Sequence, residues 1–360
     1  MEKFVCKTNI ISGAGAVSAL KTLGIRRLFL VTDPFFRENG TAQRVAAAAQ
    51  AAQVHIYDGV APDPTVELAA QGTAAVRQFQ PDAIVALGGG SAMDCAKAMA
   101  YFAGGGIRLV MIPTTSGSGS EVTDFSVLTH NGVKHPLVDA SICPDTAILD
   151  SDLLQALPRG LIADAGFDVL SHAVEALAAK NAGSITDALA KDAFIAAFSA
   201  LPASFAGQQQ VRLKIHTAAT MAGIAFNQAG LGLCHAMSHA LGGLFHLPHG
   251  RLNAILLPGV ITCNASAAGH KYAALARSAG LGGSADTLAV RNLKNALIRL
   301  RRELKLPDTL AAAGIAPQKV WYSTESIVEA VLSDPCCATN PVKVEPLLVR
   351  QLLEAVTGRV

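Results

Sequence analysis

Residues able to bind a metal ion are concentrated in the middle of the chain. Asp168 and His172 are separated by one helical turn of sequence. Four histidines then follow within a short stretch: His235, His239, His246 and His249. The residues around them are mostly apolar or small, and a buried carboxylate or imidazole needs a partner to offset its lost hydration. Because one carboxylate with several imidazoles is a ligand set for a divalent transition metal, the sequence predicts a metal-dependent enzyme.

The spacing of the first pair predicts a helix that presents both side chains. Residues 163–179 contain no proline and a single glycine, so this segment should be helical. Asp168, His172 and Glu175 then fall on one face of that helix. Two ligands on successive turns of a rigid helix are also the arrangement of H-E-x-x-H metal sites.

The later histidines are expected to divide between a helix and a loop. His235 and His239 repeat the four-residue spacing, whereas His246 and His249 lie on the loop that follows. For any one of these histidines, a hydrogen-bonded structural role is the better interpretation. Together with the separate carboxylate–histidine pair they favour a metal site, because apolar helices rarely hold so many imidazoles without a use. The residue types alone do not say which of the four bind the ion.

The composition is that expected of a two-domain enzyme in the cytoplasm. The chain has 360 residues, of which 51% are hydrophobic and 16% charged, and no apolar stretch approaches the roughly 18 residues of a bilayer span. The net charge of +2 forms no basic stripe, which argues against nucleic acid, and the low charge favours a homo-oligomer. Seven cysteines without a C-x-x-C pair predict reduced thiols, and the N-terminus lacks the apolar core of a secretion signal.

Strand and helix patterns alternate in the first part of the chain and give way to helices alone. Expected strands fall near 27–32, 54–57, 82–87 and 108–112, and expected helices near 41–52, 66–79 and 92–102. This alternation predicts a largely parallel sheet covered on both faces. Beyond Asp150, long segments rich in alanine and leucine predict helices near 161–180, 185–200, 209–227, 232–245, 286–304 and 344–357. We therefore expect an α/β domain over residues 1–153 and an all-α domain over residues 154–360.

Two glycine-rich turns predict a site for a dinucleotide. The sequence GGGS at 88–91 follows an expected strand and opens a helix, so its glycines and free amides can hold a pyrophosphate. A second turn at 113–120, rich in threonine and serine, follows the next strand. Each alone is most simply a tight turn, but two in succession at the carboxyl edge of a sheet favour a nucleotide. Asp33 ends the first strand and either accepts from ribose hydroxyls, which selects NAD over NADP, or is only a turn residue.

These segments resemble the iron-containing (group III) alcohol dehydrogenases. The similarity runs in order through DGVAPDPT, GGGSAMDCAK, IPTTSGSGSEVT, GFDVLSHAVEA, AGLGLCHAMSHALGGLFHLPHG and TNP at 339–341. Within the family, the pattern is closest to the ethanol and 1-propanol dehydrogenases of bacterial microcompartment pathways. The resemblance implies a dehydroquinate synthase-like architecture, NAD(H) as cofactor, and Fe²⁺ as the metal with Zn²⁺ as the alternative.

The resemblance also assigns individual residues. It implies four metal ligands: Asp168, His172, His235 and His249. His239 would lie beside them as a catalytic residue that carries protons. The implied cofactor-binding residues are Asp33, Gly89, Gly90, Ser91, Asp94, Thr114, Thr115, Thr123 and Lys134. The chain departs from the family pattern at Asp63, Arg251 and Val342 and is short between Tyr101 and Arg108, which bears on cofactor affinity and surface contacts.

The predicted reaction is the reversible, NAD(H)-dependent interconversion of a short-chain primary alcohol and its aldehyde, such as 1-propanol and propanal or ethanol and acetaldehyde. The ion would act as a Lewis acid on the substrate oxygen, and hydride would move directly to or from the nicotinamide. The alternatives are a glycerol or diol dehydrogenase, a dehydroquinate-synthase-like lyase, and a non-catalytic scaffold. A lyase would need more basic residues than Lys134, and a scaffold would be favoured by a missing ligand. We expect an enzyme of the cytoplasm or of a bacterial microcompartment, with no membrane or nucleic-acid partner.

Overall fold

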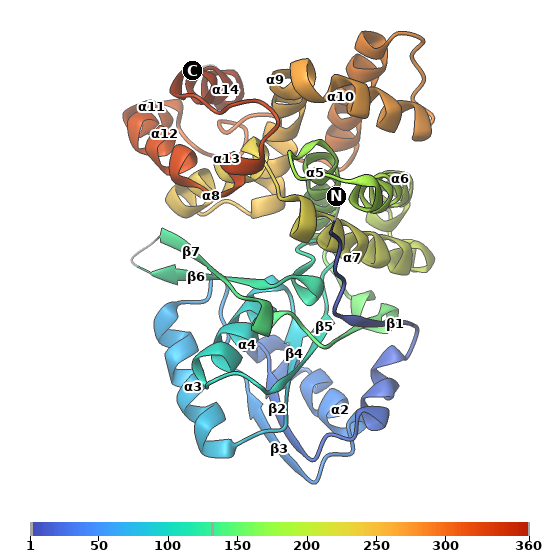
Figure 1. The fold of residues 1–360 in the computed structure, drawn as a ribbon, viewed down its shortest axis with the longest axis vertical. Helices are drawn as coiled ribbons and strands as arrows, with labels where there is room; N and C mark the ends of the chain where they lie inside the picture. Colours follow the sequence, from blue (N-terminus) through green and yellow to red (C-terminus); the bar gives the residue numbers. More distant parts are fainter. Residues whose placement is uncertain (1–2, 131–132, 359–360) are drawn as a thin grey trace. The chain divides into compact units, whose positions relative to one another are not determined.

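The computed structural model describes residues 3–130 and 133–358. Its contacts divide the chain into two compact units, one from Val5 to Leu157 and one that begins at Pro158 and also includes the described residues before Val5. The first unit contains the strands and the second is helical (Figure 1). This division lies close to the one predicted after residue 153, which we keep as a proposal for the domain boundary.

The N-terminal unit is built around a six-stranded parallel sheet. In spatial order its strands are β1 (Asn9–Gly13), β8 (Thr146–Asp150), β5 (Arg108–Pro113), β4 (Ala83–Gly88), β2 (Arg27–Val31) and β3 (Gln53–Tyr57). Every neighbouring pair runs parallel. The carboxyl ends of β2, β4 and β5 therefore lie side by side at one edge, which is where open α/β sheets bind their ligands.

Both faces of the sheet are buried by helices. Side chains alternate along each strand. Phe29 and Ile84 pack with α3 (Val66–Phe79) and α4 (Gly90–Phe102) in one apolar cluster. The next residues along, including Leu28 and Val85, pack in a second cluster with the 3-10 helix η1 (Ala16–Leu23) and with α2 (Thr41–Ala48). A parallel sheet enclosed in this way confirms the predicted fold class of this unit.

The sequence patterns did not reveal four of the strands. β1 lies at the sheet edge and is largely exposed, so it has no continuous apolar run. β8 is short and fully buried. β6 (Phe125–His130) and β7 (Val133–Val138) form a separate antiparallel pair, and β7 contains Pro136, a residue that lowers strand propensity.

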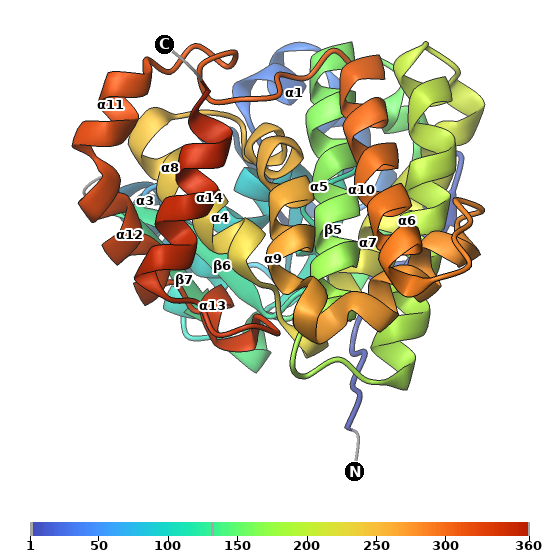
Figure 2. The same ribbon diagram turned by 90° about the horizontal axis from the view of Figure 1, so that it is seen from above.

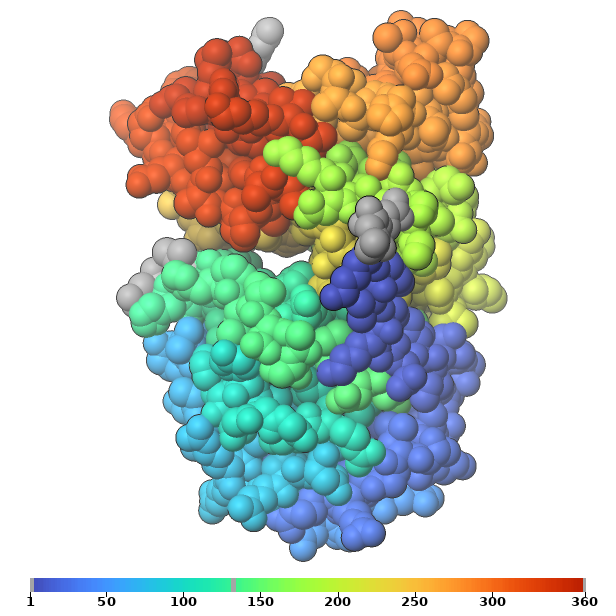
Figure 3. All heavy atoms as spheres, viewed as in Figure 1, coloured from blue at the N-terminus to red at the C-terminus, as the bar shows by residue number. Residues whose placement is uncertain are grey.

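Helix α5 (Arg159–Ala178) is the centre of the C-terminal unit. It is buried on nearly all sides and packs against α6 (Ser184–Phe205), α7 (Arg212–Ala229) and α9 (His249–Ser278). Figure 2 shows α5 and α9 running side by side. The remaining helices are α8 (Leu233–Phe245), α10 (Asp286–Glu303), α11 (Pro317–Tyr322), α12 (Thr324–Ser333), α13 (Cys336–Thr339) and α14 (Pro346–Thr357). In Figure 3 the last part of the chain, in red, and the α10 region, in orange, cover different parts of this unit's surface.

The loop predicted to carry His246 and His249 is shorter than expected, because α8 ends at Phe245 and a long helix, α9, begins at His249. His249 is the first residue of α9 rather than a loop residue. No helix was predicted over the span of α9, because Pro258 and the buried residues Asn253 and Asn264 interrupt its apolar pattern. His246 ends α8 in a left-handed conformation with φ of 55° and is exposed.

Two helices are long and apolar enough to cross a membrane by length and composition alone. They are α6 and α9, in contrast with the expectation that no stretch would approach that length. Most of the apolar window of α9 is buried inside the protein, which is also the property of a core helix. Two such helices are weak support for a membrane span.

Gly250 allows α9 to approach α5 beside the predicted metal ligands. A Cβ atom at this position would lie 1.9 Å from the backbone oxygen of Asp164. We expect Gly250→Ala to lower the free energy of unfolding by about 3 kcal/mol, because the two helix backbones must separate. Gly269→Ala on the same helix is the control: nothing lies within 4 Å of its Cβ, and alanine should stabilise it by about 0.5–1 kcal/mol. Equal stability of the two variants in urea unfolding would contradict this close approach.

Candidate functional site

Three helices of the C-terminal unit bring the four predicted metal ligands together. Asp168 and His172 lie on α5, His235 on α8, and His249 at the start of α9. The Oδ1 atom of Asp168 lies near three Nε2 atoms: 3.9 Å from His172, 4.0 Å from His235 and 3.5 Å from His249. Two ligands that are each about 2.1 Å from one ion lie about 3–4 Å apart, so these atoms can share an ion.

The environment of His235 shows that the site fits a metal. Its side chain is 1% exposed, and its Nδ1 lies 2.6 Å from a carboxylate oxygen of Glu175. Its Nε2 is buried and has no hydrogen-bond partner among the described residues. Burial, with His172 and His239 nearby, holds the pKa of His235 well below its ordinary value, so the ring is neutral and able to bind a metal. An ion beside Asp168 would satisfy the Nε2 atom.

Glu175 fixes His235 and the helix that carries it. Its carboxylate accepts backbone N–H groups from Gly232, Cys234 and His235 at 2.7–3.3 Å, at the start of α8, in addition to the His235 ring. A carboxylate at a helix N-terminus satisfies amides that have no partner in the helix and favours the positive end of the dipole. Burial raises the pKa of Glu175 to about 7, while the three backbone N–H groups oppose that shift. The spacing placed Glu175 on the ligand face, but its role becomes visible only in the structure.

Asn253 fixes Asp168 in the same way. Its Nδ2 donates to Asp168 Oδ1 at 2.8 Å, and its Oδ1 accepts from Ser238 at 2.5 Å. Asn253 was not among the predicted site residues, because it lies on α9, a helix that was not predicted. A ligand carboxylate held by a buried amide cannot rotate away from the ion, and such supporting residues affect metal affinity.

The TNP segment closes this network from the C-terminal end of the chain. Thr339 donates to the carbonyl of Leu231 at 2.6 Å. Asn340 accepts from the backbone of Leu233 at 3.1 Å and exchanges hydrogen bonds with Asn264 at 2.9 Å. Asn340 also donates to the backbone carbonyl of Val342, a position at which the chain departs from the family pattern. This contact does not depend on the side chain of residue 342. The segment therefore anchors the loop that leads into α8.

His239 lies next to the four predicted ligands and is paired with Asp334. Its Nδ1 is 2.8 Å from Asp334 Oδ2, and its ring stacks on that of His249 with 5.3 Å between centroids. Burial alone would raise the pKa of Asp334, but the hydrogen bond and charge of His239, with hydrogen bonds from Cys336, lower it below its usual value. Asp334 was not among the predicted site residues, because it lies 95 positions from His239 in the chain.

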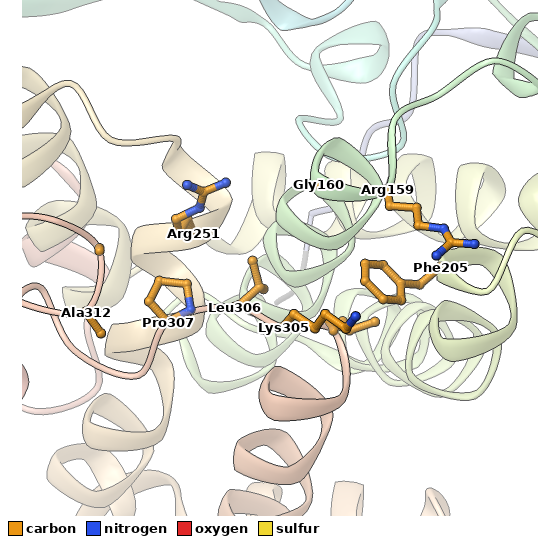
Figure 4. A pocket seen from close by; sticks show the side chains of 10 residues that line it. Arg159, Gly160, Phe205, Arg251, Lys305, Leu306, Pro307 and Ala312 are labelled. Carbon is orange, nitrogen blue, oxygen red and sulfur yellow. The ribbon is translucent and has the colours of Figure 1, made fainter.

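Arg251, one of the departures from the family pattern, links α9 to α5. Its Nε and Nη2 donate to the two oxygens of Asp164 at 3.2 and 3.0 Å. Arg251 also lines a pocket of about 400 Å³ together with Arg159, Phe205 and Lys305 (Figure 4). None of the residues that line this pocket was predicted to bind metal or cofactor. The arginine therefore acts in helix packing close to His249.

The two predicted phosphate-binding turns are neighbours in the N-terminal unit. β4 pairs with β5, and Thr114 donates its N–H to the carbonyl of Gly88 at 2.9 Å. Gly88 has φ of 154°, and a Cβ there would lie 2.6 Å from that of Ala92. Cβ atoms added at Gly89 and Gly90 would lie 3.3 Å from Thr115 and Ser118 of the second turn. A side chain is thus strongly disfavoured at Gly88, and space is tight at Gly89 and Gly90, where a pyrophosphate would approach the first turn of α4.

Asp94 and Lys97 hold the second turn and β6 against α4. The Asp94 carboxylate accepts from Ser120 at 2.7 Å and from the backbone of Val127 at 3.1 Å, so both of its oxygens are used within the unit. Lys97 is fully buried and donates to Ser120 and Thr123 at 3.0 Å. Burial lowers the pKa of Lys97 to about 8, partly offset by Asp94. Lys97 therefore positions Thr123, a predicted nucleotide residue, although no role was assigned to it from sequence.

Lys134 and Asp63 form an ion pair on the hairpin side of this unit. Lys134 Nζ lies 2.8 Å from Asp63 Oδ1, and the two side chains are 27% and 55% exposed. Asp63 has φ of 53°, a conformation that asparagine and aspartate adopt more readily than most residues. Asp therefore replaces Asn here without a backbone penalty, and its carboxylate gives Lys134 a charged partner.

Asp33 serves as a helix cap at the end of β2. Its Oδ1 accepts the N–H of Phe36 at 3.1 Å, which caps α1 (Pro34–Glu38). Its Oδ2 lies 3.9 Å from the position of a Cβ on Gly88, and therefore faces the glycine turn. The two interpretations offered by the sequence are thus compatible, because one carboxylate oxygen caps the helix while the other remains directed at the predicted nucleotide site.

A parallel-sheet unit with glycine turns at its carboxyl edge, and a helical unit with a carboxylate–histidine cluster, define a metal-dependent enzyme that uses a nicotinamide dinucleotide. Comparison with known proteins identifies the family. A model described as "Iron-containing alcohol dehydrogenase" matches residues 7–151, and one described as "Fe-containing alcohol dehydrogenase family, C-terminal" matches residues 162–357. The chain belongs to the iron-containing alcohol dehydrogenase family, as its sequence motifs predicted.

The relatives match nearly the whole chain. A 1-propanol dehydrogenase PduQ of Citrobacter freundii is 38% identical, covering 98% of this chain and 99% of its own. An NADPH-dependent butanol dehydrogenase of Clostridium saccharobutylicum is 34% identical, covering 99% and 98%. The structure of an iron-containing alcohol dehydrogenase from Thermococcus thioreducens is 34% identical with a TM-score of 0.91, covering 98% and 99%. The chain is thus an enzyme that interconverts alcohols and aldehydes with NAD(H) and iron.

Proposed function

We propose that this enzyme acts on short-chain primary alcohols and their aldehydes and holds its ion through Asp168, His172, His235 and His249. The observation that carries the ligand assignment is the meeting of these side chains around Asp168 Oδ1, with the Nε2 of His235 buried and without a partner. The preference for a small substrate is supported by the 38% identity to a 1-propanol dehydrogenase. Fe²⁺ is the proposed metal and Zn²⁺ the alternative, since both accept imidazole and carboxylate ligands.

Different side chains of the site bind the metal, orient its ligands and transfer the proton. When bound, the ion supplies a Lewis acid for the substrate oxygen. Glu175 and Asn253 keep His235 and Asp168 in place. Asp334 holds the Nδ1 proton of His239, so the Nε2 atom is the one that can take up or release the proton that accompanies hydride transfer. Half-buried His239 has access to solvent for that proton.

In the N-terminal unit, we propose that the glycine turn at 88–91 binds the pyrophosphate together with Thr114 and Thr115. No side chain caps the first turn of α4 at Gly89, and a glycine is needed at position 88. Thr123 and Asp94 would line the nicotinamide end, held by Lys97 and Ser120. Lys134, which is paired with Asp63 in this structure, would donate a hydrogen bond to a ribose hydroxyl of the bound nucleotide.

Asp33 is expected to select NAD(H) against NADP(H). Its Oδ2 faces the glycine turn, and a carboxylate there repels a 2′-phosphate. We expect Asp33→Gly to raise the ratio of kcat/KM for NADPH over NADH about tenfold, which corresponds to ~1.4 kcal/mol. Asp33→Asn is the sharper variant, because asparagine also caps a helix and only the charge is lost. If the cofactor preference is unchanged in both variants, Asp33 is only a helix cap.

The substrate class is tested with aldehydes of increasing length. NADH oxidation is followed anaerobically on protein of measured metal content, with acetaldehyde, propanal and longer aldehydes, and in reverse with the alcohols and with glycerol. The proposal predicts the highest kcat/KM for an unbranched aldehyde of two or three carbons. A higher kcat/KM with glycerol than with any of these alcohols would favour the diol dehydrogenase alternative instead.

We also propose a homo-oligomer that resides in the cytoplasm or in a bacterial microcompartment. The support for an oligomer is the low share of charged residues, 16%, together with exposed apolar side chains such as Tyr322 and Leu347. The microcompartment setting follows only from the resemblance to dehydrogenases of those pathways. Sedimentation velocity of the purified chain and fractionation of the producing cells test the two parts separately.

A further inference from the structure

A second group of metal-binding atoms lies beside the proposed catalytic ligands. A ring nitrogen of His239, a carboxylate oxygen of Asp334 and Sγ of Cys336 lie within 4.8 Å of one another. None of these residues belongs to the proposed set of four ligands. We propose that they form a second, weaker site for a thiophilic divalent cation, Zn²⁺ above all, and that occupation of this site inhibits the enzyme.

The Asp334 carboxylate is hydrogen-bonded through both of its oxygens. Its Oδ2 is 2.8 Å from His239 Nδ1, and its Oδ1 accepts the backbone N–H of Cys336 at 2.8 Å. These two bonds fix the carboxylate between the imidazole and the backbone of the residue that carries the thiol. Ligands of one zinc ion are about 2.0–2.3 Å from it and therefore roughly 3–4 Å apart, so small shifts of the side chains let the donors share an ion.

The donor types decide which cation is bound. Nitrogen, oxygen and sulfur together suit Zn²⁺ and exclude Mg²⁺ and Ca²⁺ as preferred ions, because those prefer oxygen ligands. The proposed catalytic set has no sulfur, so the two sites differ in chemistry as well as in position. The side chains of His239 and Asp334 are 30% and 13% exposed, which leaves room for water as a further ligand.

Binding exchanges protons for coordinate bonds and involves no electron transfer. The Cys336 thiol loses its proton to solvent as the metal–sulfur bond forms, and the proton of His239 moves from Nδ1 to Nε2 as Nδ1 binds the ion. Burial, with Asp334 nearby, raises the pKa of Cys336 well above its ordinary value. The thiol proton is therefore costly to remove, and this cost makes the metal affinity of the site lower than that of a site made of imidazoles.

Inhibition follows from the part that His239 has in the proposed function, and that half of the inference rests on it. An ion bound to Nδ1 replaces the hydrogen bond between His239 and Asp334. The imidazole then carries its proton on Nε2, which can no longer take up the proton of the reaction. The ring also stacks on His249, so a shift of His239 disturbs a proposed catalytic ligand.

Cys337 provides a matched control. It is the next residue in the chain, but its Sγ donates to the carbonyl of Val331 at 3.0 Å and is absent from the cluster. Cys336→Ser therefore removes the proposed sulfur ligand, whereas Cys337→Ser removes a neighbouring thiol of the same helix.

The site is tested with Co²⁺, which replaces Zn²⁺ and gives an intense thiolate-to-cobalt charge-transfer band in the near ultraviolet. Excess Co²⁺ is added to the full chain, without substrate, for the wild-type protein and both variants. We expect the band in the wild type and in Cys337→Ser, and no band in Cys336→Ser. Survival of the band in Cys336→Ser, or its absence from the wild type, overturns the site, whatever reaction the enzyme catalyses.

The inhibitory role is tested by titrating the iron-loaded enzyme with ZnCl₂ and normalising each protein to its own rate without zinc. We expect the zinc concentration for half inhibition to rise at least about tenfold in Cys336→Ser, as for loss of a metal-binding residue, and to stay at the wild-type value in Cys337→Ser. Equal inhibition of all three proteins overturns this role.

Discussion

Replacing His249 by alanine is expected to remove the bound metal and the dehydrogenase activity together. His249 is the histidine whose Nε2 lies nearest to Asp168 Oδ1, at 3.5 Å, and its loss leaves three donors. Loss of residues that merely support a metal ligand costs about 10–100-fold in affinity or activity, so loss of the ligand itself should exceed that range. NADH binding should persist, because the proposed phosphate-binding turns belong to the other unit of the chain.

The measurement combines metal content by atomic emission, steady-state activity and NADH fluorescence on one preparation. His270→Ala is the matched control, since His270 is an exposed histidine of the same helix, α9. It should keep the wild-type metal content and rate. Full activity of His249→Ala would contradict the ligand assignment.

Replacing Glu175 by alanine is expected to have the second-largest effect. It should lower both the free energy of unfolding and the affinity for the metal. The carboxylate is 1% exposed and accepts three backbone N–H groups at the start of α8 in addition to the ring of His235. Removing one partner of such a buried group costs about 3–5 kcal/mol, because the others are left unsatisfied. Without Glu175 the His235 ring is also free to choose the wrong tautomer, which should weaken metal binding about 10–100-fold.

Glu175→Gln separates these two effects. Glutamine keeps the volume and one acceptor oxygen, so most of the stability should remain. It cannot hold the Nδ1 proton of His235 as a carboxylate does, so the metal affinity should still fall. Urea unfolding of the metal-free proteins and competition for the metal with a chelator give the two quantities. Wild-type values for Glu175→Ala in both would show that the carboxylate neither caps α8 nor orients His235.

The sequence was most informative where chemistry and periodicity fell on one element. α5 was predicted from a run without proline, and it does place Asp168, His172 and Glu175 on one side. The glycine turns were predicted because each follows a buried strand, and the pairing of β4 with β5 makes them neighbours. Both inferences use interactions between residues close in the chain, which a local pattern can record.

What the sequence could not reveal are partners that tertiary packing brings together. Asn253 lies 85 positions from Asp168, and Asp334 lies 95 positions from His239. Neither has a spacing that points to its partner, and α9 was obscured by buried polar residues that serve this network. The family motifs supplied the ligand set that residue types alone had left open among four histidines.

The most direct test of metal-assisted hydride transfer is the dependence of activity on metal occupancy. The protein is stripped with a chelator under anaerobic conditions, reloaded with graded amounts of Fe²⁺, and assayed for NADH oxidation by propanal at each measured metal content. Activity should be absent from the stripped protein and should rise in proportion to bound iron up to one ion per chain. Undiminished activity of the metal-free protein, or a rate that does not follow the iron content, would contradict the proposed centre of Asp168, His172, His235 and His249.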